Sequence, residues 1–182
     1  MNSHDSKDRP ARLLVDYWTL FKEKRLGAPI LDLACGDGQN GIFLATKDLP
    51  VICCDISEKA LSRAEKLAAE NHVKVALWQV DQEVEETNPL PEDSYGGILV
   101  FHYLHRALIP CIRKALQKGG ILFYETFTIG QPKFGKPHNP NFLLKPGELL
   151  ARFKDWEIIY DFEGIKEGPK RAVAQLVCRK PR

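Results

Sequence analysis

The sequence has no apolar run long enough to cross a membrane. Its longest such runs, at residues 98–101 and 121–124, are far shorter than the roughly 18 residues that a membrane-spanning helix needs. Residues 1–10 are polar and mixed in charge, so they lack the apolar segment of a secretion signal. We therefore expect a cytoplasmic protein that does not bind membranes.

Cysteines are scarce, and their spacing suits neither a disulfide framework nor a metal site. There are five, an odd number, and no two of them form a C-x-x-C pair. They are Cys35, Cys53, Cys54, Cys111 and Cys178. We expect most of them to be small buried hydrophobic residues in a reducing compartment, and we expect no metal cofactor.

The chain is too short for two ordinary domains. It has 182 residues, against about 150 for a typical single domain. With 44% hydrophobic and 27% charged residues, it has the balance of a globular protein rather than of a disordered or fibrous one. We expect one domain over residues 1–182, made of an N-terminal helical segment (1–28), a cofactor-binding core (29–125), a basic proline-rich loop (126–147) and a C-terminal helix with a hairpin (148–182).

The small net charge of +2 hides an asymmetry between the two halves of the chain. Residues 1–95 carry 11 Lys and Arg against 17 Asp and Glu, whereas residues 96–182 carry 15 against 7. Solvated helix faces explain such a difference most simply. The functional alternative is a basic, substrate-facing surface that attracts phosphate or carboxylate groups.

Short apolar runs alternate with helical patterns, and Ser57 is a candidate N-cap for one of the helices. Strands buried on both faces are expected at 30–34, 51–54, 73–79, 97–101 and 121–124, and helices at 9–24, 40–46, 57–70, 104–117 and 146–153. Residues 156–162 and 172–178 are expected to form a hairpin through 164–168. This order predicts a doubly wound, Rossmann-like α/β fold. Its seven-stranded sheet is mostly parallel, ends in an antiparallel hairpin and has helices on both faces.

The segment after the first expected strand has glycines where a tight turn would bring a ligand against bare main chain. Gly36-x-Gly38-x-x-Gly41 matches the dinucleotide fingerprint, so a nicotinamide enzyme is one alternative. Asp32 and Asp37 would repel a pyrophosphate, however. A cationic ligand therefore fits this loop better.

This loop and the strand after it resemble the class I S-adenosylmethionine-dependent methyltransferases. The first motif of that family reads roughly acid-x-G-x-G-x-G, and the chain has Asp32-Leu33-Ala34-Cys35-Gly36-Asp37-Gly38, with Ala34 in place of the first glycine. The family also has an acid at the end of the next strand. Asp55 stands there, 19 residues after Gly36. The cofactor carries an ammonium group and a sulfonium, which suit an acidic loop.

The resemblance implies that these positions bind S-adenosylmethionine and, after transfer, S-adenosylhomocysteine. Asp55 would hold the ribose hydroxyls, Ile56 would pack on adenine, and Asp81 would accept from the adenine amine. The expected cofactor contacts are Asp32, Ala34, Cys35, Gly36, Asp37, Gly38, Asp55, Ile56, Asp81, Gln82 and Phe101. The alternative for each aspartate is a helix cap or a turn residue.

Candidates for the chemistry follow the fourth and fifth expected strands. Methyl transfer needs alignment of the acceptor, exclusion of water and sometimes removal of a proton. His102 or His105 is a candidate base because imidazole titrates near neutral pH, and Arg106 is a candidate clamp for an anion. Glu125 ends the fifth strand and faces the same expected cleft. The alternative for each histidine is a hydrogen-bonded residue that caps a helix.

Three segments, 102–106, 125–127 and 139–149, are together similar to a small bacterial group described as tellurite-resistance-type methyltransferases. This resemblance does not carry tellurite over as the substrate. Between Thr126 and Gly147 there is no acidic residue, while lysines stand among phenylalanines, so we expect this basic loop to be a lid over the substrate.

The leading hypothesis is a compact methyltransferase that acts on a small-molecule or anionic acceptor. One alternative is a non-catalytic module that binds S-adenosylmethionine as a signal. Another is an RNA-directed methyltransferase, which the basic second half supports but which lacks a recognised RNA-binding module. The sequence leaves the oligomeric state open.

Overall fold

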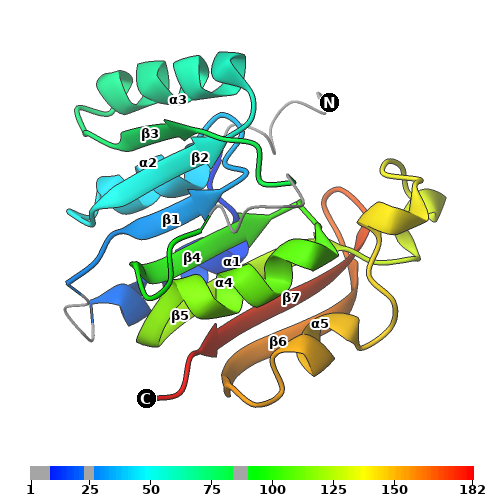
Figure 1. Cartoon of the computed structure of the whole chain (residues 1–182). Coiled ribbons are helices and arrows are strands. Elements are labelled where there is room, and N and C mark those ends of the chain that lie inside the picture. The colour runs from blue at the N-terminus through cyan, green and yellow to red at the C-terminus, as the bar shows by residue number, and fades with distance from the viewer. Residues whose placement is uncertain (1–8, 23–26, 84–89) are drawn as a thin grey trace.

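A computed structural model of the chain describes residues 9–22, 27–83 and 90–182, and it contains one seven-stranded sheet (Figure 1). The strands are β1 (Ile30–Leu33), β2 (Val51–Asp55), β3 (Ala76–Gln79), β4 (Tyr95–Phe101), β5 (Leu116–Phe127), β6 (Glu157–Lys166) and β7 (Arg171–Arg179). Their order across the sheet is β3-β2-β1-β4-β5-β7-β6. β1 to β5 pair in parallel, and β7 pairs antiparallel with both β5 and β6. The predicted fold class is confirmed.

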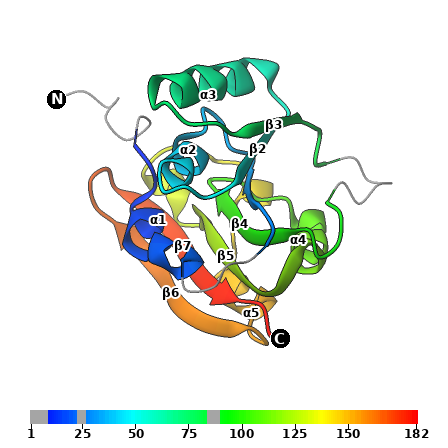
Figure 2. The same ribbon diagram turned by 90° about the vertical axis from the view of Figure 1, so that its left-hand side faces the viewer.

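Helices cover both faces of this sheet (Figures 1 and 2). They are α1 (Arg12–Tyr17), α2 (Gln39–Ala45), α3 (Glu58–Glu70), α4 (Ile109–Ala115) and α5 (Glu148–Arg152), with short 3-10 turns η1 (Trp18–Phe21), η2 (Arg106–Leu108), η3 (Gln131–Lys133) and η4 (Pro140–Phe142). Leu14 of α1 and Leu44 of α2 pack on one face, and Ile112 of α4 and Leu149 of α5 pack on the other. No helix within the described ranges is long and apolar enough to cross a membrane.

Two of the sequence-based expectations, one about a strand and one about a helix, were wrong in detail. β3 was expected to be buried on both faces, but it lies at the edge of the sheet and Leu77 is exposed. The reason is that, among the described residues, β3 pairs with β2 alone. The helix expected over 104–117 ends at Ala115, because Leu116 turns to extended backbone and pairs with Tyr95 as the first residue of β5.

The element ends also differ from expectation near the two termini of the chain. The helix expected over 9–24 is a short α-helix followed by a 3-10 turn within the described residues. The hairpin at the end of the sheet is confirmed, but its turn lies after residue 166, because Gly164 pairs with Val173 inside the ladder. Ser57 caps α3 as expected, since its hydroxyl accepts from the N–H of Ala60.

Candidate functional site

The loop between β1 and α2 turns through backbone conformations that favour glycine. Ala34, Gly36 and Gly38 have φ angles of 53°, 54° and 81°, in the left-handed region where a side chain is strained. A Cβ at Gly36 would meet nothing within 4 Å, whereas one at Gly38 would lie 2.8 Å from the Cβ of Ala64 on α3. The loop therefore packs closely on α3 and leaves bare main chain facing open space at Gly36.

Asp32 of β1 is hydrogen-bonded to the main chain at the start of α2, just after this loop. Its side chain is buried, and its Oδ2 accepts a hydrogen bond of 2.8 Å from the N–H of Gly41 at the start of α2. Burial raises the pKa of Asp32 to about 7, with a smaller contribution from the charge of Asp55, although the hydrogen bond from Gly41 opposes it. This carboxyl group consequently takes up a proton near neutral pH.

We expect Asp32→Asn to stabilise the protein without ligand at about pH 8 by about 1–3 kcal/mol. The folded-state pKa lies above the ordinary value of 3.8. Stability is therefore lost as pH rises from about 4 to about 7, and the neutral amide avoids this loss. Urea unfolding at several pH values measures the effect. Equal stability of variant and wild type at every pH would contradict the assignment.

Asp55 and Ile56 flank the open side of the same loop. One carboxylate oxygen of Asp55 accepts from the N–H of Gly36 at 2.9 Å, and the other accepts from the N–H of Ser57 at 2.9 Å. Ile56, the next residue, is 62% exposed. An apolar surface thus lies directly beside a half-buried carboxylate at the end of β2.

Asp81 and Gln82 follow β3 at this edge. Asp81 is exposed, and its Oδ1 accepts from the N–H of Glu83 at 2.8 Å. Gln82 is 8% exposed; its Nε2 donates to Cys54 Sγ at 2.9 Å, and its Oε1 is buried without a partner among the residues that the structure describes. A buried amide oxygen without a donor is costly unless a ligand supplies one.

The remaining expected cofactor residues make protein contacts close to the loop. Asp37 pairs with Arg63 of α3 at 2.7 Å, Cys35 is half-buried, and Phe101 is buried at the end of β4. The contacts expected of them with a cofactor stay predictions. The open face of Gly36, the exposed Ile56 and the Gln82 oxygen, which has no partner among the described residues, lie after neighbouring parallel strands at one edge of the sheet.

A second polar cluster centres on Glu125, in the part of β5 that pairs with β4 and β7. Glu125 is 2% exposed, and its carboxylate is 3.5 Å from His102 Nε2 and 3.6 Å from Arg171 Nη2. It also accepts a hydrogen bond from Nε2 of Gln175. Burial alone would raise the pKa of Glu125, but the hydrogen bonds from His102 and Gln175 and the charge of Arg171 hold it below its usual value. The carboxylate stays ionised although it is buried.

His102 holds a constrained position beside this carboxylate. Its φ of 56° is rare for a residue other than glycine, and its N–H donates to the Glu125 carbonyl at 2.8 Å. Its ring stacks on Phe127 at 5.1 Å, while 46% of its side chain is exposed. The imidazole is therefore fixed against Glu125 but open to solvent. His105, by contrast, lies at the start of η2 and is not part of this cluster.

Sequence reasoning missed Gln175, Arg171 and Lys166, which complete the cluster from the β6–β7 hairpin. Gln175 is 2% exposed, and its Oε1 accepts from Lys166 Nζ at 3.2 Å and from the Tyr160 hydroxyl at 3.4 Å. One signal could have identified Gln175. It is the single amide in an otherwise apolar strand at 172–178, where a buried polar side chain needs a partner.

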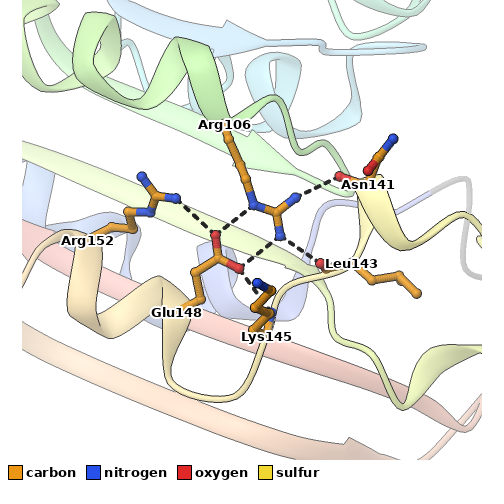
Figure 3. Close-up of polar contacts among 6 residues, drawn as sticks. All are labelled: Arg106, Asn141, Leu143, Lys145, Glu148 and Arg152. Carbon is orange, nitrogen blue, oxygen red and sulfur yellow. Dashed lines mark hydrogen bonds and ion pairs between the residues drawn. The ribbon is translucent and has the colours of Figure 1, made fainter.

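Arg106 is separated from this cluster by its own contacts (Figure 3). Its guanidinium donates to both carboxylate oxygens of Glu148, at 2.7 and 2.8 Å, and to the carbonyls of Asn141 and Leu143. These bonds join η2 to α5 and to the basic loop. They give Arg106 a structural role, and its proposed use as an anion clamp stays a prediction.

The two ends of the basic loop pair with each other, and the loop also contacts β7. Thr128 pairs with Leu144, and Gln131 is buried, its Oε1 accepting from the N–H of Ala172. Between these points Ile129 and Phe142 are exposed. The loop thus presents apolar side chains to solvent, while its expected function as a lid stays a prediction.

Comparison with known proteins agrees with this geometry. Residues 30–120 match a family model described as a methyltransferase domain. A curated relative, the probable S-adenosyl-L-methionine-dependent methyltransferase TehB of Haemophilus influenzae (strain 10810), is 25% identical over 145 residues. The match covers 76% of this chain and 49% of that protein, so the chain spans about half the length of the relative.

Solved structures share the fold. The crystal structure of TehB from Haemophilus influenzae has a TM-score of 0.71 and 19% identity, covering 90% of this chain and 62% of that one. The magnesium protoporphyrin IX methyltransferase of Synechocystis PCC 6803, with bound SAH, has a TM-score of 0.66 and 19% identity, covering 91% of this chain and 80% of that one. At such identities the likeness concerns the fold.

Proposed function

Because the chain belongs to the methyltransferase domain family, matched over residues 30–120, we propose that it transfers a methyl group from S-adenosylmethionine to a small-molecule acceptor. The observation that supports this most directly is the turn at Gly36. A Cβ at this position would meet nothing within 4 Å, the Gly36 N–H donates to the Asp55 carboxylate, and the turn lies at the same edge of the sheet as His102 and Glu125.

Each residue of this edge has a defined part in holding the cofactor. Asp55 would accept from the ribose hydroxyls with the lone pairs that its backbone partners leave free, and Ile56 would cover one face of adenine. Gln82 would use its unpartnered oxygen, with Asp81, to accept from the adenine amine. When bound, the cofactor supplies an electrophilic methyl group on a sulfonium.

His102 is the residue best placed to take a proton from the acceptor. Its imidazole is open to solvent on one side and lies 3.5 Å from the ionised Glu125 on the other. The buried carboxylate would stabilise the imidazolium that forms on proton transfer. Glu125 itself is enclosed by protein donors, so it acts through His102 rather than on the acceptor.

We expect Asp55→Ala to weaken S-adenosylmethionine binding by about 1–3 kcal/mol, through loss of a charge-assisted hydrogen bond to ribose. Calorimetric titration measures this loss. Asp161→Ala, which changes an exposed carboxylate on β6, is the control and should bind as wild type does. Unchanged affinity in the Asp55 variant would refute the ribose assignment.

The same titration tests the proposed function as a whole. S-adenosylmethionine and S-adenosylhomocysteine should bind and NAD should not, since residues 30–120 match a methyltransferase domain. Binding without transfer of labelled methyl to any acceptor would favour a non-catalytic module. Absence of binding by folded protein would exclude the proposed cofactor.

A further inference from the structure

A polar cavity of about 480 Å³ lies between α1 and the β6–β7 hairpin, outside the glycine loop. Four of its lining residues come from α1 (Arg12, Leu13, Asp16 and Tyr17) and three from the hairpin (Tyr160, Lys166 and Gln175). Its volume is within the range of about 300–1,000 Å³ that small ligands fill. It is thus sized for a metabolite rather than for a macromolecule.

The charges in this cavity are unbalanced. Arg12 is neutralised by Asp16, one turn along α1, at 2.8 Å. Lys166, by contrast, contacts the neutral amide of Gln175 at 3.2 Å and the ring of Phe162 at 6.0 Å, and it forms no ion pair with any residue in the described ranges. A cation held against an amide and a ring is available to an anionic group of a ligand.

Buried hydrogen bonds connect this cavity to the proposed reaction centre. Gln175 lines the cavity with its Oε1 bonded to Lys166, and its Nε2 donates to Glu125. Glu125 in turn holds His102. Val100 of β4 pairs with Leu33 of β1, so the residues that follow these two strands, including His102, lie at the same edge as the glycine loop.

We propose that this cavity holds the methyl acceptor, a small organic molecule whose anionic group pairs with Lys166. This inference rests on the proposed function. In the reaction, an atom of the acceptor donates a lone pair to the methyl carbon, and the carbon–sulfur bond breaks with its electron pair left on sulfur. Any proton that the attacking atom carries passes to His102.

The test uses S-adenosylmethionine with a labelled methyl group and the small-molecule fraction of a cell extract, freed of protein and nucleic acid. The labelled product should be retained by an anion exchanger. Lys166→Gln should lower the initial rate of label transfer by about tenfold or more, and Lys166→Arg should restore most of it. Lys170→Gln, which changes an exposed lysine paired with Glu167 in the hairpin turn, should leave the rate unchanged.

Binding of S-adenosylmethionine, measured by calorimetry in each variant, separates the two proposals. A neutral or cationic product, or a Lys166→Gln variant as fast as wild type, would overturn the assignment of the cavity while the proposed function stands. In parallel reactions with the separated RNA and protein fractions of the same extract, label found in these fractions alone would overturn it as well. Failure of wild type to bind the cofactor, or to transfer label to any fraction, would instead refute the proposed function and this inference with it.

Discussion

Replacing Gly38 by alanine is expected to lower the free energy of unfolding by about 2–5 kcal/mol. The φ of 81° would strain any residue with a Cβ, and the new methyl group would lie 2.8 Å from the Cβ of Ala64 and 3.0 Å from Ile42. Both contacts are with buried, well-packed side chains, so α3 or the loop must move. Urea unfolding measures the loss.

Gly36→Ala is the matched variant, because it shares the positive φ but not the contacts. A Cβ at Gly36 meets nothing within 4 Å, so backbone strain of about 1–2 kcal/mol is the expected cost in stability. The methyl group would nevertheless occupy the space proposed for the cofactor, and binding should weaken by about tenfold or more. A stable Gly36→Ala protein with unchanged cofactor affinity would place the cofactor elsewhere.

The second large effect is expected from Arg106→Leu, which should lower stability by about 2–4 kcal/mol. The change leaves the Glu148 carboxylate, whose side chain is 12% exposed, without its bidentate partner and leaves two loop carbonyls without a donor (Figure 3). This loss of stability is smaller than for a fully buried ion pair, because 32% of the Arg106 side chain is exposed to solvent. Arg106→Lys should recover part of the loss.

The pH dependence of stability identifies the partner of Arg106. Hydrogen bonding to Arg106, opposed by burial, holds the pKa of Glu148 at about 2, against an ordinary value of 4.5. A lowered carboxyl pKa stabilises the fold above about pH 4.5, and this stability is lost as pH falls toward about 2. In wild type, the free energy of unfolding should therefore fall with pH over this range. Both Arg106→Leu and Glu148→Gln should reduce this slope of unfolding free energy against pH. An unchanged slope in Glu148→Gln would assign it to another carboxyl group.

The fold, and the gathering of Asp32, the glycine loop and Asp55 at one end of the sheet, were predictable because their signals are local in the sequence. Asp32 lies in β1, the small residues of the first loop follow β1, and Asp55 ends β2; parallel strands bring their carboxyl ends together. The hydrogen bond from Gly36 to Asp55 was not predictable, although both residues were expected at the site. Its consequence is that Asp55, the residue proposed to hold the ribose, also fixes the shape of the loop.

The contacts that sequence reasoning missed join residues far apart in the chain. Arg106 and Glu148 are 42 positions apart, and Glu125 and Gln175 are 50 apart. Periodicity reports which face of an element is apolar, but it does not report which polar side chains meet across that face. The exposure of β3 was missed for a similar reason, since an apolar run does not indicate whether a strand has one neighbour or two.

The position of β7 between β5 and β6 has a consequence for biosynthesis. Among the described strands, β6 pairs with β7 alone. The ribosome nevertheless synthesises β6 before β7. While residues 171–179 are still inside the ribosome, the nascent chain therefore carries an unpaired strand edge on β5 and a detached β6. Such edges favour aggregation. Assistance by chaperones should accordingly matter most in the short interval between emergence of β5 and emergence of β7.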